Sequence, residues 1–314
     1  MNGMECRVCG ARGVAYVGYL RAYLCADHFV DYFERRFLRT IQVFRMVSPG
    51  ERVAVAVSGG KDSLSLLYLF NKYWEVLGLK EVIAITIDEG VTGLRGRADH
   101  VARYARAYGV ELVTVSFEDE LGLTLDQMVD RLVERGLEYK PCSVCGVFKR
   151  YILNRVAREV GADKLAVGHN LDDEVQVFLM NIFRNSPLNL AREAPVTGLL
   201  RHERFVPRVK PLYYAPEREV YIYSLLVGIE PYESRCPYLK YSLRNAFRRW
   251  INRLELDAPG AKYHFLAAKE VMSTVVTRAL ASGLRLGTCR VCGEPSSAPL
   301  CRACLFKRYL GIEH

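Results

Sequence analysis

The hexapeptide SGGKDS, residues 58 to 63, has the composition of a phosphate-binding loop. Its members are Ser58, Gly59, Gly60, Lys61, Asp62 and Ser63. The glycines allow the backbone to approach an anion, the hydroxyls donate hydrogen bonds, and the lysine supplies a positive charge. The loop is not a Walker A motif, because an aspartate follows the lysine. We therefore expect a phosphate site of another kind, and a glycine-rich turn without phosphate is the alternative.

The ten cysteines fall mostly into CxxC pairs, which bind metal or do redox work in a reducing cytosol. Two groups have the ligand types and spacing of a tetrahedral zinc site. The N-terminal group is Cys6, Cys9, Cys25 and His28, and the C-terminal group is Cys289, Cys292, Cys301 and Cys304. We expect one structural Zn²⁺ in each group; unrelated buried thiols are the alternative.

Three cysteines remain outside these groups: Cys142, Cys145 and Cys236. A structural zinc ion takes four protein ligands, whereas three thiolates leave one coordination position free for a substrate, a water or an exogenous sulfur. The fold would have to bring Cys236 to the CxxC pair. Two alternatives stay open, namely an unrelated Cys236 and a redox dithiol formed by Cys142 and Cys236.

Consecutive acidic residues occur in GHNLDDE, residues 168 to 174. Asp172, Asp173 and Glu174 would open a helix, where acidic side chains interact favourably with the helix dipole. That effect explains one or two of them. A further acid at a phosphate site is better explained by Mg²⁺ binding or by proton transfer.

Short apolar runs separated by helical patterns indicate a parallel sheet. The strands are expected at residues 52–57, 81–88, 110–117 and 163–169, and helices near residues 95–108, 124–135, 146–160, 171–184 and 263–282. This alternation predicts a doubly wound, mostly parallel α/β fold, with ligands at the carboxyl ends of the strands. SGGKDS, DEGVTG and GHNLDDE each follow a strand, so we expect all three at one edge.

The net charge of +9 is concentrated in the second half of the chain, where 24 basic residues face 16 acidic ones. A polyanion such as nucleic acid is the natural partner, and a solvated basic surface is the alternative. Within residues 241–256, Arg244, Arg248 and Arg249 could follow a phosphate backbone while an apolar face packs on the sheet domain. Residues 185–216 are a candidate substrate loop. No apolar segment is long enough to cross a membrane and no signal peptide is evident, so we expect a cytoplasmic protein.

Five blocks occur in order along the chain: SGGKDS, DEGVTGLR, PCSVCGVFKR, GHNLDDE and RCPY. Together with the flanking zinc-type groups they resemble the tRNA 2-thiouridine synthetases of the TtuA type, which contain the PP-loop of N-type ATP pyrophosphatases. The resemblance spans essentially the whole chain. It implies an N-terminal zinc finger at residues 1–32, a PP-loop catalytic domain at residues 33–282 and a C-terminal zinc ribbon at residues 283–314.

The resemblance implies that Cys142, Cys145 and Cys236 hold a [4Fe-4S] cluster whose fourth iron can carry sulfur. ATP and Mg²⁺ would then adenylate the C2 oxygen of a tRNA uridine before sulfur replaces it. By motif position, the candidate catalytic residues are Lys149, Asp173, Lys61 and Asp62. The candidate nucleotide-binding residues are the six loop residues, Gly168, Asp173 and, near the adenine, Ile85, Thr86 and Ile87.

The implied partners are tRNA, a ubiquitin-like sulfur carrier with a C-terminal thiocarboxylate, and a second copy of the chain. We favour the T-loop uridine as the target, because thiolation there rigidifies tRNA in heat-adapted cells. The sister group that thiolates the wobble uridine shares these blocks and is the nearest rival, while the tRNA 2-thiocytidine synthetases usually lack both zinc modules. A non-enzymatic RNA-binding or redox-sensing protein with zinc and an iron–sulfur cluster is the rival from another class.

Overall fold

Buried aliphatic runs form the central sheet of the computed structural model, which describes residues 4–197, 202–234, 236–280 and 287–313. Its strands are β3 (Arg52–Ala56), β4 (Glu81–Asp88), β5 (Glu111–Ser116), β6 (Lys164–Val167) and β7 (Arg208–Val209). Within the described residues they are all parallel, in the order β5-β4-β3-β6-β7. The predicted α/β class with a mostly parallel sheet is confirmed.

The strand order reverses at β3. The chain adds β4 and β5 on one side of β3 and then returns to add β6 and β7 on the other side. At such a switch point the loops after the two central strands separate and leave a crevice for a ligand. The loops after β3 and β6 carry SGGKDS and GHNLDDE, so the topology brings these two motifs together.

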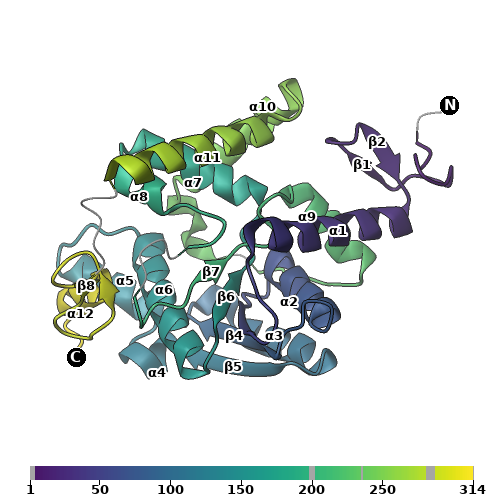
Figure 1. The fold of residues 1–314 in the computed structure, drawn as a ribbon. Coiled ribbons are helices and arrows are strands. Elements are labelled where there is room, and N and C mark those ends of the chain that lie inside the picture. The colour runs from purple at the N-terminus through teal and green to yellow at the C-terminus, as the bar shows by residue number, and fades with distance from the viewer. Residues whose placement is uncertain (1–3, 198–201, 235, 281–286, 314) are drawn as a thin grey trace.

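Helices cover both faces of the sheet and form a further group beside it (Figure 1). They are α1 (Ala26–Phe44), α2 (Lys61–Tyr73), α3 (Arg97–Ala107), α4 (Phe117–Leu121), α5 (Leu125–Glu134), α6 (Pro141–Glu159), α7 (Leu171–Phe183), α8 (Pro187–Arg192), α9 (Glu217–Leu226), α10 (Arg244–Asp257), α11 (Ala261–Leu280) and α12 (Arg302–Leu310), with 3-10 turns η1 (Thr92–Leu94) and η2 (Pro237–Tyr241). Because side chains alternate along a strand, Val53 and Val55 pack with α1 and α2, whereas Ala54 faces the core shared by α5 and α6. None of the helices in the described residues is long and apolar enough to span a membrane.

The two ends of the chain form small modules at opposite sides of the molecule (Figure 1). The N-terminal module contains the hairpin β1 (Ala15–Val17) and β2 (Ala22–Leu24), and the C-terminal module contains β8 (Gly287–Thr288), β9 (Pro295–Ser296) and α12. In the C-terminal module, Phe306 packs near Phe148 of α6 and Tyr139 just before that helix. The N-terminal module continues directly into α1, which runs across the expected domain boundary after residue 32.

Two local expectations differ from the structure, and a third agrees with it. The helix expected from residue 146 begins at Pro141, so the CxxC pair lies inside α6 and does not form a separate knuckle; proline is favourable in the first helical turn because its missing N–H is not needed there. Outside residues 198–201, which the structure does not describe, the segment 185–216 contains α8 and β7 in addition to irregular backbone. The apolar face of α10 packs on α7, the helix that follows β6, and on α11, where Phe247 contacts Phe183 and Trp250 contacts Phe265, in agreement with the expected packing on the sheet domain.

Candidate active site

The phosphate loop joins the carboxyl end of β3 to the N-terminus of α2. Gly59 has a φ of +76°, which disfavours residues with a side chain, and a Cβ there would lie 3.1 Å from Arg97 Cγ. Gly60 precedes α2 in an extended conformation, and no side chain caps the first turn of the helix. The backbone N–H groups at the start of α2 are therefore suited to bind an anion.

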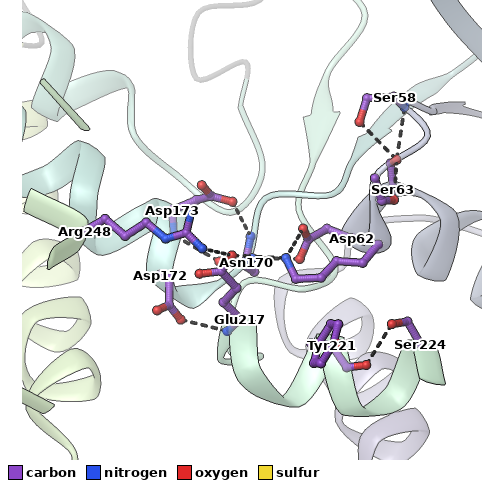
Figure 2. Close-up of polar contacts among 12 residues, drawn as sticks. Ser58, Asp62, Ser63, Asn170, Asp172, Asp173, Glu217, Tyr221, Ser224 and Arg248 are labelled. Atoms are coloured by element: carbon purple, nitrogen blue, oxygen red, sulfur yellow. Dashed lines mark hydrogen bonds and ion pairs between the residues drawn. The ribbon is translucent and has the colours of Figure 1, made fainter. Parts of the chain in front are cut away.

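The two serines of the loop hold its shape. The Ser58 N–H donates to Ser63 Oγ at 3.0 Å, and the two hydroxyl oxygens are 3.2 Å apart (Figure 2). Ser63 in turn donates to the carbonyl of Gly60 at 3.0 Å. The loop is thus braced by its own side chains, and its predicted role in nucleotide binding stays a prediction.

The loop after β6 packs directly on the first turn of α2. A Cβ on Gly168 would lie 3.0 Å from the backbone nitrogen of Ser63 and 3.1 Å from the carbonyl carbon of Asp62, so a larger residue would push the two segments apart. Asn170 also connects them, because its amide donates to Asp62 Oδ1 at 2.8 Å (Figure 2). Gly168 therefore contributes close packing of backbone at the crevice between β3 and β6.

Lys61 contacts two carboxylates in the crevice. Its Nζ lies 2.7 Å from Asp62 Oδ2 and 3.2 Å from Glu217 Oε1. Burial alone would lower the pKa of Lys61, but Asp62 and Glu217 outweigh this effect and raise it. Glu217 opens α9 and lies outside every motif that the sequence singles out, so sequence reasoning missed it.

Asp173 combines a structural contact with an ion pair. It forms a capping box with Asn170 at the start of α7, and Arg244 of α10 donates to its Oδ1 at 2.8 Å. Burial raises the pKa of Asp173, and burial also raises the pKa of Asp62. Two carboxylates that are costly to ionise in one crevice favour a cation nearby, so this pair fits a Mg²⁺ ion or a proton-transfer role.

The buried acids on either side of Asp173 have lysine partners. Asp172 pairs with Lys262 of α11, and Glu174 pairs with Lys210 and Lys269. Burial would raise the pKa of Glu174, but the two lysines hold it at about 2. These contacts explain two of the three acids structurally. Asp173 is the one of the three that contributes to raising the pKa of Asp62 in the phosphate loop.

On α6, Cys142, Cys145 and Lys149 recur at intervals of three and four residues, so they share one face of the helix. Lys149 pairs with Glu89, a side chain that is 2% exposed and lies just after β4. Arg97 pairs with the same carboxylate. Burial would raise the pKa of Glu89, but Lys149 and Arg97 outweigh it and lower that pKa.

The contact with Glu89 fixes the ammonium of Lys149 beside the cysteines. Burial would lower the pKa of Lys149, yet Glu89 raises it above its usual value, so the lysine stays charged. Sequence reasoning missed Glu89 as a partner of this lysine. Its position in DEGVTG, at the carboxyl end of a predicted strand, was a signal that could have identified it.

The third cysteine comes to this region from a distant segment. Cys236 immediately precedes η2, and η2 packs on α6. At this contact the Cys142 Sγ of α6 lies 3.6 Å from the carbonyl oxygen of Tyr238 in η2. The pKa of Cys145 is raised to about 11, mainly by burial, with Cys236 and Cys142 adding to the effect. Among the described residues these sulfurs are not all within 4.8 Å of one another. That spacing does not suit a single ion, whereas in a multi-iron cluster each thiolate binds a different iron and the sulfurs lie farther apart.

In each terminal group the four predicted ligand atoms all lie within 4.8 Å of one another. The Cys9 and Cys25 sulfurs are 3.7 Å apart, as are those of Cys292 and Cys301. Four thiolates at Zn–S distances of about 2.3 Å in a tetrahedron have sulfur–sulfur edges of roughly 3.8 Å. Both groups therefore fit a tetrahedral zinc ion.

The residues expected near the adenine lie within β4. Ile85 and Thr86 are at most 1% exposed, and Ile87 is 7% exposed. The hydroxyl of Thr86 is buried with no hydrogen-bond partner among the described residues. The Ile85 side chain packs in the core shared with α5 and α6, so of the three only Thr86 presents a free polar atom, and the adenine site stays a prediction.

Sequence comparison finds a family model and relatives that match most of the chain. A family model described as a PP-loop domain matches residues 30–255. The tRNA-5-methyluridine(54) 2-sulfurtransferase of Pyrococcus horikoshii is 34% identical over 308 residues, which cover 96% of this chain and 93% of the relative. The tRNA 2-thiolation protein NcsA of Haloferax volcanii is 33% identical over 315 residues, covering 96% and 97%.

Structural comparison extends the likeness to the whole chain. The U34-tRNA thiolase NcsA from Methanococcus maripaludis, solved with its [4Fe-4S] cluster, matches with a TM-score of 0.84 and 33% sequence identity. The match covers 100% of this chain and 99% of the thiolase. The shared fold thus includes both terminal modules as well as the crevice between β3 and β6.

Proposed function

This chain belongs to the PP-loop family of ATP-dependent tRNA 2-sulfurtransferases, and from that membership we propose that it thiolates C2 of the T-loop uridine of tRNA. The likeness to a tRNA-5-methyluridine(54) 2-sulfurtransferase supports the T-loop target, and one observation carries the reaction itself. The phosphate loop, the Lys149–Glu89 pair and the cysteines of α6 all belong to segments at the carboxyl edge of a single sheet. Activation by ATP and attack by sulfur can therefore occur on one bound nucleotide.

The first step overcomes a poor leaving group. The C2 oxygen of uridine attacks the α-phosphorus of ATP, the bond to the β-phosphate breaks, and pyrophosphate leaves with the electron pair. The N–H groups that open α2, together with Lys61, would stabilise the charge that passes to pyrophosphate. Asp62 and Asp173 would hold Mg²⁺, which supplies further stabilisation of this charge when bound.

The second step replaces oxygen by sulfur. A sulfur nucleophile attacks C2, the C2–O bond breaks, and AMP departs with the oxygen. Lys149, kept charged by Glu89, would stabilise the negative charge that develops during the attack. Cys142, Cys145 and Cys236 would hold a [4Fe-4S] cluster, which when bound offers one iron without a protein thiolate as a carrier for sulfur. The likeness to a thiolase solved with such a cluster supports this assignment.

Further components follow from the same family. The terminal groups would each hold a structural zinc ion. A ubiquitin-like protein with a C-terminal thiocarboxylate would deliver the sulfur, two copies of the chain would form a homodimer, and the protein would work in the cytosol.

Anaerobic incubation of the purified protein with tRNA, ATP, Mg²⁺ and sulfide tests the reaction. We expect 2-thiouridine in the T-loop, with one pyrophosphate and one AMP released for each sulfur incorporated. A protein with intact metal content that binds tRNA but forms no thiouridine would instead be an RNA-binding or redox-sensing protein. Activity that survives removal of iron while the thiols stay reduced would favour the dithiol mechanism of Cys142 and Cys236.

The wobble uridine is the second candidate target, because the whole chain resembles a U34-tRNA thiolase with a TM-score of 0.84. Mass spectrometry of nuclease fragments from the thiolated tRNA separates the two targets. Sulfur in the T-loop fragment alone supports the first proposal, and sulfur in the anticodon fragment alone supports the second.

A further inference from the structure

Helix α10 lies beside the candidate active site with little apolar anchoring. Of its 14 residues, Ile251 alone is buried. Trp250 is 50% exposed and Leu256 is 76% exposed, although both are large apolar side chains. Apolar packing therefore does not explain by itself why this helix is held against the nucleotide crevice.

Two arginines of α10 reach into the crevice. Arg244 and Arg248 are four residues apart and so lie on the same face of the helix. Arg248 donates to Glu217 Oε1 at 2.7 Å (Figure 2). Arg244 donates to Asp173 Oδ1 at 2.8 Å. Both arginines thus contact carboxylates that belong to the nucleotide site.

The contact of Arg248 brings it next to the phosphate loop. The oxygen that accepts its hydrogen bond, Glu217 Oε1, is also the oxygen that contacts Lys61 Nζ at 3.2 Å. The guanidinium and the ammonium therefore converge on one atom. A phosphate bound by Lys61 at the N-terminus of α2 would lie within reach of Arg248.

The two ion pairs are too exposed for their main role to be stabilising the position of α10. The side chains of Arg244 and Arg248 are 37% and 50% exposed, and pairs at such exposure contribute little to stability. A triphosphate, in contrast, brings several negative charges into a crevice that already contains Asp62, Asp173 and Glu217. Cations are needed there to offset the repulsion, and guanidinium groups bind phosphate oxygens with two parallel hydrogen bonds.

We propose that Arg244 and Arg248 are nucleotide-binding residues that contact the phosphates of ATP, with Asp173 and Glu217 orienting them before the nucleotide arrives. The inference deepens the proposed function and rests on ATP being its substrate. On binding, Mg²⁺ and the phosphates take over the contacts that the carboxylates and guanidiniums make with each other. From the sequence alone these arginines are expected to contact an RNA backbone. Their position in the crevice instead favours contact with the phosphates of ATP.

The test compares three full-length, metal-replete variants: R244Q, R248Q and the matched control R253Q. Arg253 lies on the same helix, is 76% exposed and pairs with Asp257 only through a surface contact at 3.2 Å. Calorimetry measures the dissociation constant of a non-hydrolysable ATP analogue with Mg²⁺, and a filter assay measures that of a tRNA transcript. Thermal unfolding checks that each variant is folded.

We expect R244Q and R248Q each to weaken binding of the ATP analogue by about 10-fold or more, the size expected for a lost charged hydrogen bond. R253Q should stay within twofold of the original chain, and tRNA affinity should change little in all three. Unchanged affinity for the analogue in both crevice variants, or an equal loss in R253Q, would overturn the inference. Loss of tRNA affinity alone would assign the arginines to the RNA backbone.

The result is independent of the thiolation assay. If the original chain binds the ATP analogue but thiolates no tRNA, the proposed function fails while the arginine measurement still stands. If thiolation proceeds and the variants bind the analogue normally, the arginine inference alone fails.

Discussion

The cysteines of the terminal groups and the central cysteines Cys142, Cys145 and Cys236 are brought together by different parts of the structure. In the terminal groups all ligands come from one short segment, and their sulfurs already lie at the edge length of a zinc tetrahedron. In the central site Cys142 and Cys145 come from one helix and Cys236 from a distant turn. The spacing of ligands within one short segment is enough to form each terminal group, whereas the central cysteines come together only when the whole fold has formed.

One thiol in each terminal group has an environment that the central thiols lack. Burial would raise the pKa of Cys6 and Cys289, but backbone N–H groups outweigh this and lower both to about 6. Burial raises the pKa of Cys145 to about 11 and does the same for Cys292, so the thiols of a terminal group are not all alike. Each terminal group therefore contains one thiol that ionises readily and suits a structural cation, whereas the pKa of both Cys142 and Cys145 is raised.

The largest effect should come from breaking a terminal group. C304S removes a fully buried cysteine that we expect to be a zinc ligand, and structural zinc contributes on the order of 10 kcal/mol to folding such modules. We expect loss of one zinc per chain and rapid proteolysis within residues 289–310. Metal analysis and limited proteolysis measure this outcome. Full zinc content in C304S would contradict the assignment.

Breaking the central site should leave the fold intact and abolish the reaction. C145S is expected to lower thiolation by on the order of 10³-fold or more, because it removes a proposed ligand of the cluster that would carry sulfur. Iron content should fall while the zinc content and the thermal midpoint are retained. C304S is the matched comparison, since it should lose zinc and keep iron. Normal thiolation by C145S would remove the distinction between the two kinds of site.

The same contrast explains what the sequence predicted. The strands and the phosphate loop were predictable because Val53, Val55 and the glycines that follow form continuous local patterns. The start of α6 was not, since a CxxC pair looks the same in a knuckle and in the first turn of a helix. Glu217 had no signal, because its role depends on α9 packing next to α2 and not on its neighbours in the chain.

The stability of the region around α7 also depends on buried ion pairs between Glu174 and the lysines Lys210 and Lys269. E174Q leaves Lys269, which is fully buried, without its closest carboxylate and should lower the free energy of unfolding by about 3 kcal/mol at pH 7. The pKa of Glu174 is lowered from 4.5 to about 2, so its contribution is complete above about pH 4.5 and is lost as the pH falls toward 2. Urea titrations should show the difference between the two chains shrinking across this range. A difference in unfolding free energy that stays constant down to pH 2 would contradict this account. The control is E193Q, because Glu193 is a more exposed partner of the same lysines and its loss should lower the free energy of unfolding by less.

Lys149 tests whether charge beside the cysteines matters apart from the cysteines themselves. K149A is expected to reduce single-turnover thiolation by about 10²-fold, since it removes a cation that stabilises developing negative charge. K149R should retain part of the rate. The control is K140A, because Lys140 is exposed one residue before α6 and has no ion pair among the described residues. Equal rates for K149A and K140A would leave the lysine without a chemical role.

The smallest effect should come from the cap that supports the Glu89 loop. Thr124 forms a capping box with Gln127 at the start of α5, and T124A should cost about 1 kcal/mol of unfolding free energy. The neighbouring N–H of Leu125 donates to the Glu89 carbonyl at 2.7 Å, so the cap lies directly against the segment that holds Lys149. S116A removes the comparable cap of α4 and is the matched control. Because the Leu125 N–H does not depend on the threonine hydroxyl, both variants should lose similar stability and less than threefold activity. A much larger loss of thiolation in T124A alone would mean that the local cap, and not the long-range fold, sets the position of Glu89.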